Sequence, residues 1–141
     1  MHKIDFLKDL RQIVARKLDN MGYPSNPSEE LQTVLMRYLN IMKRLPPVIK
    51  WKIEISQEIK EKKITTKIKD GLDMFIKSAQ SGIDLKPYTS THILNADYAD
   101  GMLNDWGIFH FHLGTKTGNK GFIKRTDEVL FGIAKNVRGI L

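Results

Sequence analysis

The sequence predicts an α+β fold in which N-terminal helices pack on a small antiparallel β-sheet. Apolar residues follow helical spacing in the first 45 residues, whereas two-residue alternation and short apolar runs appear later. A length of 141 residues fits one domain with a modest core. We therefore expect a single domain over 1–141, with a helical hairpin at 1–45 and a strand, a helix and a C-terminal antiparallel sheet within 47–141.

The two N-terminal helices are predicted from apolar stripes on either side of a break. Apolar residues recur at three- and four-residue steps over 3–20, which is typical of an amphipathic helix. Beyond a glycine and a proline, Asn26, Pro27 and Glu29 match the preferences for a helix start. The second helix should then continue up to the proline pair at 46–47, which cannot extend it.

The middle of the chain combines both periodicities. Residues 49–55 alternate between apolar and charged side chains, which predicts a half-buried strand. Helical spacing over 57–81 predicts a helix, although Gly71 weakens its interior. We expect a loop at 84–90 and a short helix or turn at 97–105.

The C-terminal sheet is predicted from two apolar segments. These are 106–113 and 129–134, with a polar, glycine-containing loop at 114–121 after the first. Asn136 indicates a turn, and the chain stops in apolar sequence at 139–141. We therefore expect either a fragment of a longer chain or an end that forms a sheet strand.

Composition limits the classes of protein and of partner. The net charge of +7 and the pI of about 9.6 favour a polyanionic partner such as RNA, although an acidic protein or simple solvation would also suit them. The absence of cysteine excludes disulfides and thiolate chemistry. No apolar run is long enough for a membrane span and no secretion signal is present, so we expect a cytoplasmic protein without a membrane partner.

The segment at 106–114 is the part of the sequence that points most directly to chemistry. It holds His110 and His112, which a strand places on one face, with Phe109 and Phe111 on the other. Burying two imidazoles among aromatic residues is costly unless each has a partner. Such pairs bind metals, move protons or complete hydrogen-bond networks.

Metal-independent cleavage of RNA is the first functional hypothesis. His110 and His112 would serve as base and acid, and Arg125 would stabilise the phosphate, because its planar guanidinium matches two phosphate oxygens. Lysines near this histidine pair would guide the RNA backbone: Lys116, Lys120 and Lys124.

Two alternatives stay open. The first is a metal-dependent enzyme that binds zinc or another divalent transition metal, with candidate ligands His92, His110, His112 and Asp100, or another nearby aspartate. The second is a non-catalytic nucleic-acid or protein interaction module in which the histidines are structural. The two tryptophans, Trp51 and Trp106, are expected in the core rather than as base-stacking platforms.

Three segments resemble uncharacterised small prokaryotic proteins with a Trp-Gly-Ile-x-His-x-His-Leu-Gly type of sequence. They are 82–88, 103–114 and 124–131. This resemblance implies a further strand and another histidine beyond the present C-terminus. The order of elements and the residue types are also similar to RelE/barnase-type toxin ribonucleases. That second likeness implies a site at His110, His112 and Arg125. Our working hypothesis is an RNA-cleaving toxin or phage-defence component that an acidic antitoxin-like protein holds in check.

Overall fold

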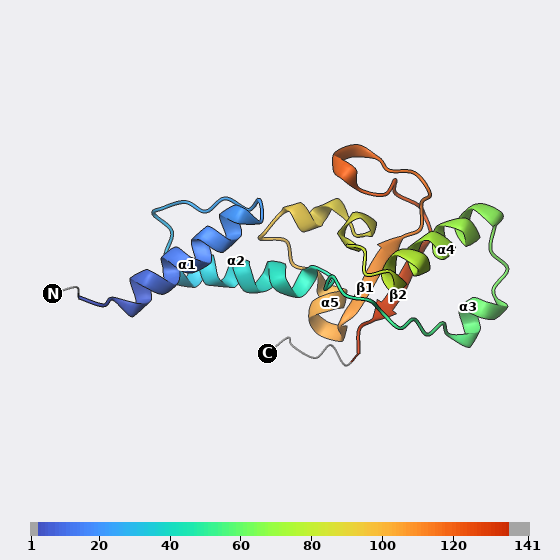
Figure 1. Ribbon diagram of the computed structural model, residues 1–141, viewed down its shortest axis with the longest axis horizontal. Coiled ribbons are helices and arrows are strands. Elements are labelled where there is room, and N and C mark those ends of the chain that lie inside the picture. Colours follow the sequence, from blue (N-terminus) through green and yellow to red (C-terminus); the bar gives the residue numbers. More distant parts are fainter. Residues whose placement is uncertain (1–2, 136–141) are drawn as a thin grey trace. The chain divides into compact units, whose positions relative to one another are not determined.

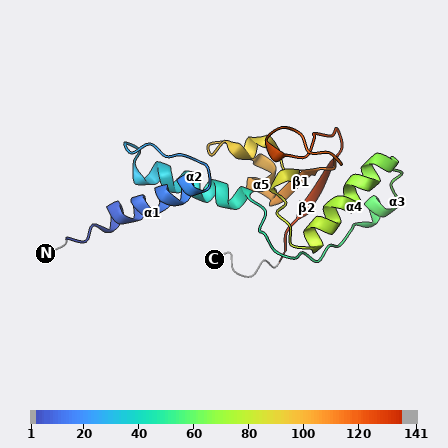
Figure 2. The same ribbon diagram turned by 45° about the horizontal axis from the view of Figure 1, so that its top comes forward.

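The computed structural model describes residues 3–135, which form two compact units. Unit 1 comprises residues 3–45 and His92–Asp100, and unit 2 comprises Pro46–Thr91 and 101–135. Figures 1 and 2 show helices in both units and one antiparallel pair of strands, which confirms the α+β class. Packing of the N-terminal helices on the sheet stays a prediction.

Unit 1 is built on the predicted pair of helices. α1 (Phe6–Asn20) and α2 (Leu31–Arg44) lie side by side in Figure 1. The Asp5 side chain accepts a hydrogen bond from the backbone N–H of Lys8, which fixes the start of α1. The core of the unit is formed by both helices and by the loop between them. Its buried residues include Val14, Leu18, Tyr23, Val34 and Ile41. The apolar periodicity therefore identified both helices and the face on which they pack.

The expected start of the second helix is wrong by one turn. The Asn26 side chain accepts a hydrogen bond from the Ser28 N–H, and the Glu29 carboxylate accepts one from the Asn26 N–H. These capping bonds close a separate turn, and α2 begins only at Leu31. Arg11 on α1 donates to carbonyl groups of the same turn, so tertiary contacts stabilise it outside the helix.

A buried guanidinium joins α2 to the rest of unit 1. Arg44 is 4% exposed and donates to the carbonyl oxygens of His92 and Asn95. It also lies over the ring of Tyr98, with 5.3 Å between the guanidinium carbon and the ring centroid. Burial lowers the Arg44 pKa from its ordinary value. Carbonyl and aromatic groups thus take the place of the water that this charge loses.

Unit 2 packs a helix on one face of the sheet. β1 (Ile108–His112) pairs with β2 (Val129–Ile133), and both strands lie beside α4 (Thr66–Gln80) in Figures 1 and 2. Phe75 of α4 contacts Phe111 of β1, with 4.7 Å between the ring centroids. These strands confirm the predicted antiparallel sheet and place Phe111 on the face opposite the histidines.

Gly71 lies at the closest approach of α4 to the end of β1. A Cβ atom at this position would stand 1.7 Å from the Leu113 carbonyl oxygen. The glycine that weakens the helix locally is therefore required by the packing. Its propensity cost is offset by close contact between the helix and the sheet.

Of the two elements predicted in the middle of the chain, the strand is wrong and the helix is divided in two. Residues 49–55 are extended, but they pair with no strand in the part of the chain that the structure describes. Instead the backbone N–H of Trp51 donates to the Ala79 carbonyl at the end of α4, at 3.0 Å. The predicted helix at 57–81 is divided into α3 (Gln57–Glu61) and α4, because Thr65 caps the second piece by accepting from the Ile68 N–H.

The remaining elements are short. They are η1 (Lys86–Tyr88), η2 (Thr91–Leu94), α5 (Gly101–Trp106) and η3 (Asn119–Gly121). Trp106 is 75% exposed, so its predicted place in the core is wrong. The expected turn at Asn136 and the apolar end at 139–141 lie outside the described residues. Within 3–135, no helix has the length and apolar character that crossing a membrane requires.

Candidate anion-binding site

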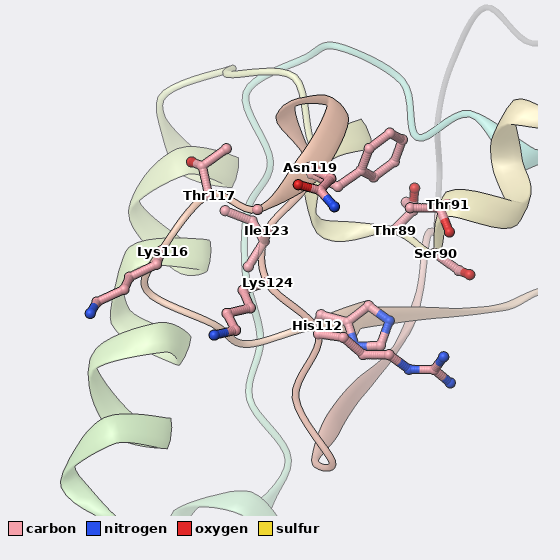
Figure 3. A pocket seen from close by; sticks show the side chains of 12 residues that line it. Thr89, Ser90, Thr91, His112, Lys116, Thr117, Asn119, Ile123 and Lys124 are labelled. Carbon is pink, nitrogen blue, oxygen red and sulfur yellow. The ribbon is translucent and has the colours of Figure 1, made fainter.

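A pocket of about 510 Å³ lies within unit 2. Three segments form it: residues 89–91, the end of β1 and the loop that follows β1. In Figure 3, Ser90 and Thr91 lie to one side of His112, and Lys116 and Lys124 lie to the other. The lining residues are Thr89, Ser90, Thr91, His112, Lys116, Thr117, Gly118, Asn119, Phe122, Ile123, Lys124 and Arg125.

The loop that forms one wall is a small hairpin over 116–124. The Lys124 N–H donates to the Lys116 carbonyl at 2.8 Å, and Thr117 and Ile123 form an antiparallel bridge. Lys120 sits near the tip with a φ of 58°, a left-handed conformation. The segment predicted as a polar loop at 114–121 is thus part of a hydrogen-bonded hairpin, which holds Lys116 and Lys124 next to each other.

Long-range contacts hold this hairpin against the rest of the pocket. The Ile123 N–H donates to the Pro87 carbonyl at 2.7 Å, which joins the hairpin to the segment before Thr89. A Cβ atom on Gly114 would lie 2.4 Å from the Lys124 carbonyl oxygen, so only glycine permits this approach. The walls of the pocket are therefore fixed by backbone contacts.

His112 is the buried polar group of the pocket. Its side chain is 6% exposed, and its Nδ1 atom is buried without a hydrogen-bond partner among the described residues. Burial lowers the His112 pKa, and the positive charges of Arg125 and His110 lower it further, while a hydrogen bond with the Thr126 backbone acts in the opposite direction. The ring is therefore kept neutral at pH values where an exposed histidine begins to take up a proton.

Positive charge gathers around this ring without matching negative charge. Lys116, Lys124 and Arg125 line the pocket and are exposed, and none of the lining residues in the described chain carries a carboxylate. The ion pairs described within residues 3–135 do not include any of these three side chains. Such a pocket attracts an anion, for which the neighbouring hydroxyl groups of 89–91 supply further donors.

The structure brings together four of the residues that the sequence singled out. His112, Arg125, Lys116 and Lys124 line one pocket. His110 lies on the same strand face as His112 and is half-buried, but it is not part of the lining. Lys120 is exposed near the hairpin tip and also falls outside the lining.

The candidate metal ligands are distributed over both units. His92 and Asp100 belong to unit 1, whereas His110 and His112 belong to unit 2. Among residues 3–135, no three histidine, cysteine, aspartate or glutamate side chains gather as a metal site requires. The zinc or transition-metal alternative stays a prediction.

Sequence reasoning missed the hydroxyl-bearing side of the pocket. Thr89, Ser90 and Thr91 form an uninterrupted run of hydroxyl residues where the predicted loop at 84–90 ends. Asn119 was likewise absent from the candidate residues. The run of hydroxyl groups is a local signal, but its position opposite the lysines depends on the contact between Ile123 and Pro87.

No known protein family, curated protein or solved structure matches this chain. The resemblance to small prokaryotic proteins and the likeness to RelE/barnase-type ribonucleases stay predictions. The chemistry of the pocket is therefore the basis for inferring function.

Proposed function

We propose that the protein binds RNA and cleaves it without a metal ion, with a backbone phosphate held in the pocket of unit 2. One observation carries the proposal. His112 shares a carboxylate-free pocket with Lys116, Lys124 and Arg125. A neutral imidazole beside a group of cations is suited to taking a proton near a bound phosphate.

The cations account for binding of the phosphodiester. The Arg125 guanidinium can donate two parallel hydrogen bonds to phosphate oxygens, and the Lys116 and Lys124 ammonium groups add charge at the rim. The same three groups would stabilise the additional negative charge that the non-bridging oxygens carry when a fifth oxygen attacks phosphorus. Binding and transition-state stabilisation thus use the same side chains.

The proposed reaction uses the 2′-hydroxyl of the RNA as nucleophile. His112 takes the hydroxyl proton as the 2′ oxygen forms a bond to phosphorus, and the bond between phosphorus and the 5′ oxygen breaks. His110 gives a proton to the leaving 5′ oxygen. The products are a 2′,3′-cyclic phosphate and a 5′-hydroxyl, and the reaction needs no oxidant or reductant.

The spacing of the two histidines is compatible with these roles. Residues two apart on a strand lie about 7 Å from each other on the same face, which leaves room for a phosphate group between the rings. His112 lines the pocket and His110 is the next residue along that face, toward the start of β1. This geometry favours His112 as the base close to the bound phosphate and His110 as the acid on the leaving-group side.

A cleavage assay in EDTA tests the proposal. The substrate is a labelled single-stranded oligoribonucleotide, and the chemical control is the same sequence with 2′-deoxyribose at every position. We expect cleavage of the RNA but not of the deoxy control. The His112→Gln variant should cleave at a rate reduced by about 100-fold or more, because general base catalysis contributes about that factor or more. Circular dichroism of the variant checks that it folds.

Three outcomes would contradict cleavage at this site. They are no cleavage by the wild-type chain, equal cleavage of the deoxy control, and equal rates for the wild type and a folded His112→Gln variant. Tight, salt-dependent RNA binding without any cleavage would instead identify a non-catalytic binding module.

A further inference from the structure

The sheet of unit 2 has two unlike faces, and one of them continues from the pocket. The face toward α4 carries Phe109 and Phe111, which pack in the core of the unit. The opposite face carries His110 and His112 on β1, and on β2 it carries the residues paired with them, because directly opposed side chains of an antiparallel pair point the same way. The pocket and this second face therefore share His112.

An exposed aromatic ring stands on this second face. Phe131 pairs directly with His110 and is 54% exposed. Ile133 pairs with Ile108 further along and is 60% exposed. Large apolar side chains on a sheet face are usually covered, so a flat ring left open beside a cationic pocket suggests a ligand with both a negative backbone and planar apolar groups.

We propose that this face binds single-stranded RNA, with one base stacked on Phe131 while the adjacent phosphate occupies the pocket. The inference rests on the proposed function, because the same pocket receives the phosphate. Directly opposed residues in an antiparallel pair have Cβ atoms about 5 Å apart, so Phe131 lies beside His110, which is one strand step from the pocket residue His112. A base attached to the bound phosphate would thus reach the ring.

The occupant follows from the combination of charge and shape. A cationic pocket without carboxylates would by itself also attract an acidic protein surface. The open Phe131 ring beside the pocket favours RNA, because a nucleotide offers both a phosphate for the pocket and a planar base for the ring. In duplex RNA the bases are stacked on each other and their faces are closed to a protein side chain. The arrangement therefore selects single strands over duplexes.

The experiment compares Phe131→Ala with the wild type in binding to three probes. They are a single-stranded oligoribonucleotide, the same sequence in a duplex, and a ribose-phosphate chain of equal length that lacks bases. The matched control is Phe6→Ala, which removes an exposed phenylalanine, 70% accessible, from unit 1. Fluorescence anisotropy at fixed salt gives the dissociation constants, and a Phe131→Trp variant tests whether another stacking ring restores affinity.

We expect Phe131→Ala to weaken binding of the single strand by about 5- to 100-fold, in line with the loss of one stacked base. Binding of the base-free chain should stay unchanged, Phe131→Trp should retain affinity, and Phe6→Ala should bind like the wild type. Equal affinity of Phe131→Ala and wild type for the single strand would overturn the inference. An equal loss of affinity for the base-free chain would also overturn it. So would a Phe131→Ala variant that binds RNA like the wild type but loses self-association in sedimentation, because the face would then be a contact between copies of this chain.

The failure of this inference can be distinguished from failure of the proposed function. If replacing Lys116 and Lys124 weakens RNA binding but replacing Phe131 does not, the pocket binds phosphate and only the stacking is wrong. If neither replacement matters, RNA does not bind at this site and both proposals fall.

Discussion

The two units of this chain use positive charge in opposite ways. In unit 1, Arg44 is buried and donates to the backbone carbonyls of His92 and Asn95, and Arg37 pairs with Glu29 and Asp97. In unit 2, Lys116, Lys124 and Arg125 surround a pocket and take part in none of the ion pairs described within residues 3–135. Cations with protein partners stabilise a fold, whereas cations gathered without them can serve a ligand.

The overall balance of charge follows the same division. The described residues of unit 1 contain 8 lysines and arginines against 7 aspartates and glutamates, whereas those of unit 2 contain 14 against 9. The excess of positive charge that the whole chain shows is therefore concentrated in the unit that holds the pocket. Net charge alone could not distinguish a solvated surface from a binding site, but its distribution favours the latter.

The largest effect is expected from removing the buried cation of unit 1. Arg44→Met keeps the apolar stem but loses the hydrogen bonds to two carbonyls, and it should lower the free energy of unfolding by about 2 kcal/mol. Urea denaturation measures the free energy of unfolding. The control is Lys43→Met, which replaces the exposed neighbour of Arg44 and should change this free energy by less than about 0.5 kcal/mol. RNA affinity at a temperature where the variant is folded should not change. A variant as stable as the wild type would show that Arg44 is not a structural cation.

The second comparison replaces the cations of unit 2. Lys116→Gln with Lys124→Gln should leave the free energy of unfolding almost unchanged, because both side chains are exposed. It should reduce the slope of log affinity against log salt for single-stranded RNA by about 1.4, as expected for two lost phosphate contacts. Lys120→Gln, in the same hairpin but outside the lining, is the matched control and should retain the wild-type slope. Equal slopes for the wild type, the double variant and Lys120→Gln would show that the pocket does not bind RNA.

The smallest effect is expected in the titration of His112. Burial and the neighbouring Arg125 hold its pKa below the ordinary value, so an anion that neutralises Arg125 should raise this pKa. Proton NMR of the ring in inorganic phosphate, compared with chloride at equal ionic strength, measures the change. A pKa that is identical in the two salts would mean that phosphate does not enter the pocket.

The same titration has a consequence for stability. The folded-state pKa of His112 is lowered, so the unfolded chain binds the proton more strongly than the folded one. The free energy of unfolding therefore falls as the pH drops below about 6.5 toward the folded-state pKa. Urea unfolding at about pH 7.5 and about pH 5.5 should therefore show a greater loss for the wild type than for His112→Gln. An equal loss in both would contradict the assigned cause.

Local signals in the sequence were sufficient for the elements that depend on near neighbours. Apolar spacing identified α1 and α2, and the alternation around His110 and His112 identified β1 together with the face that each side chain occupies. Alternation misled at 49–55, because an extended segment can satisfy its backbone on the end of a helix instead of on a strand. The capping pattern at Asn26 misled for a similar reason, since its hydrogen bonds closed a turn.

By itself, the sequence determined α1 and α2, the strand pair and the residue types of the pocket that we propose binds phosphate, because periodicity and side-chain chemistry act over a few neighbouring residues. Only the tertiary structure decided that His112 enters the pocket while His110 stays beside it, and that Thr89 and its neighbours face the lysines. Those outcomes depend on contacts between segments far apart in the chain, such as Ile123 on Pro87 and α4 on Leu113 at Gly71. No local pattern encodes such contacts, because their energy arises only when the whole unit packs.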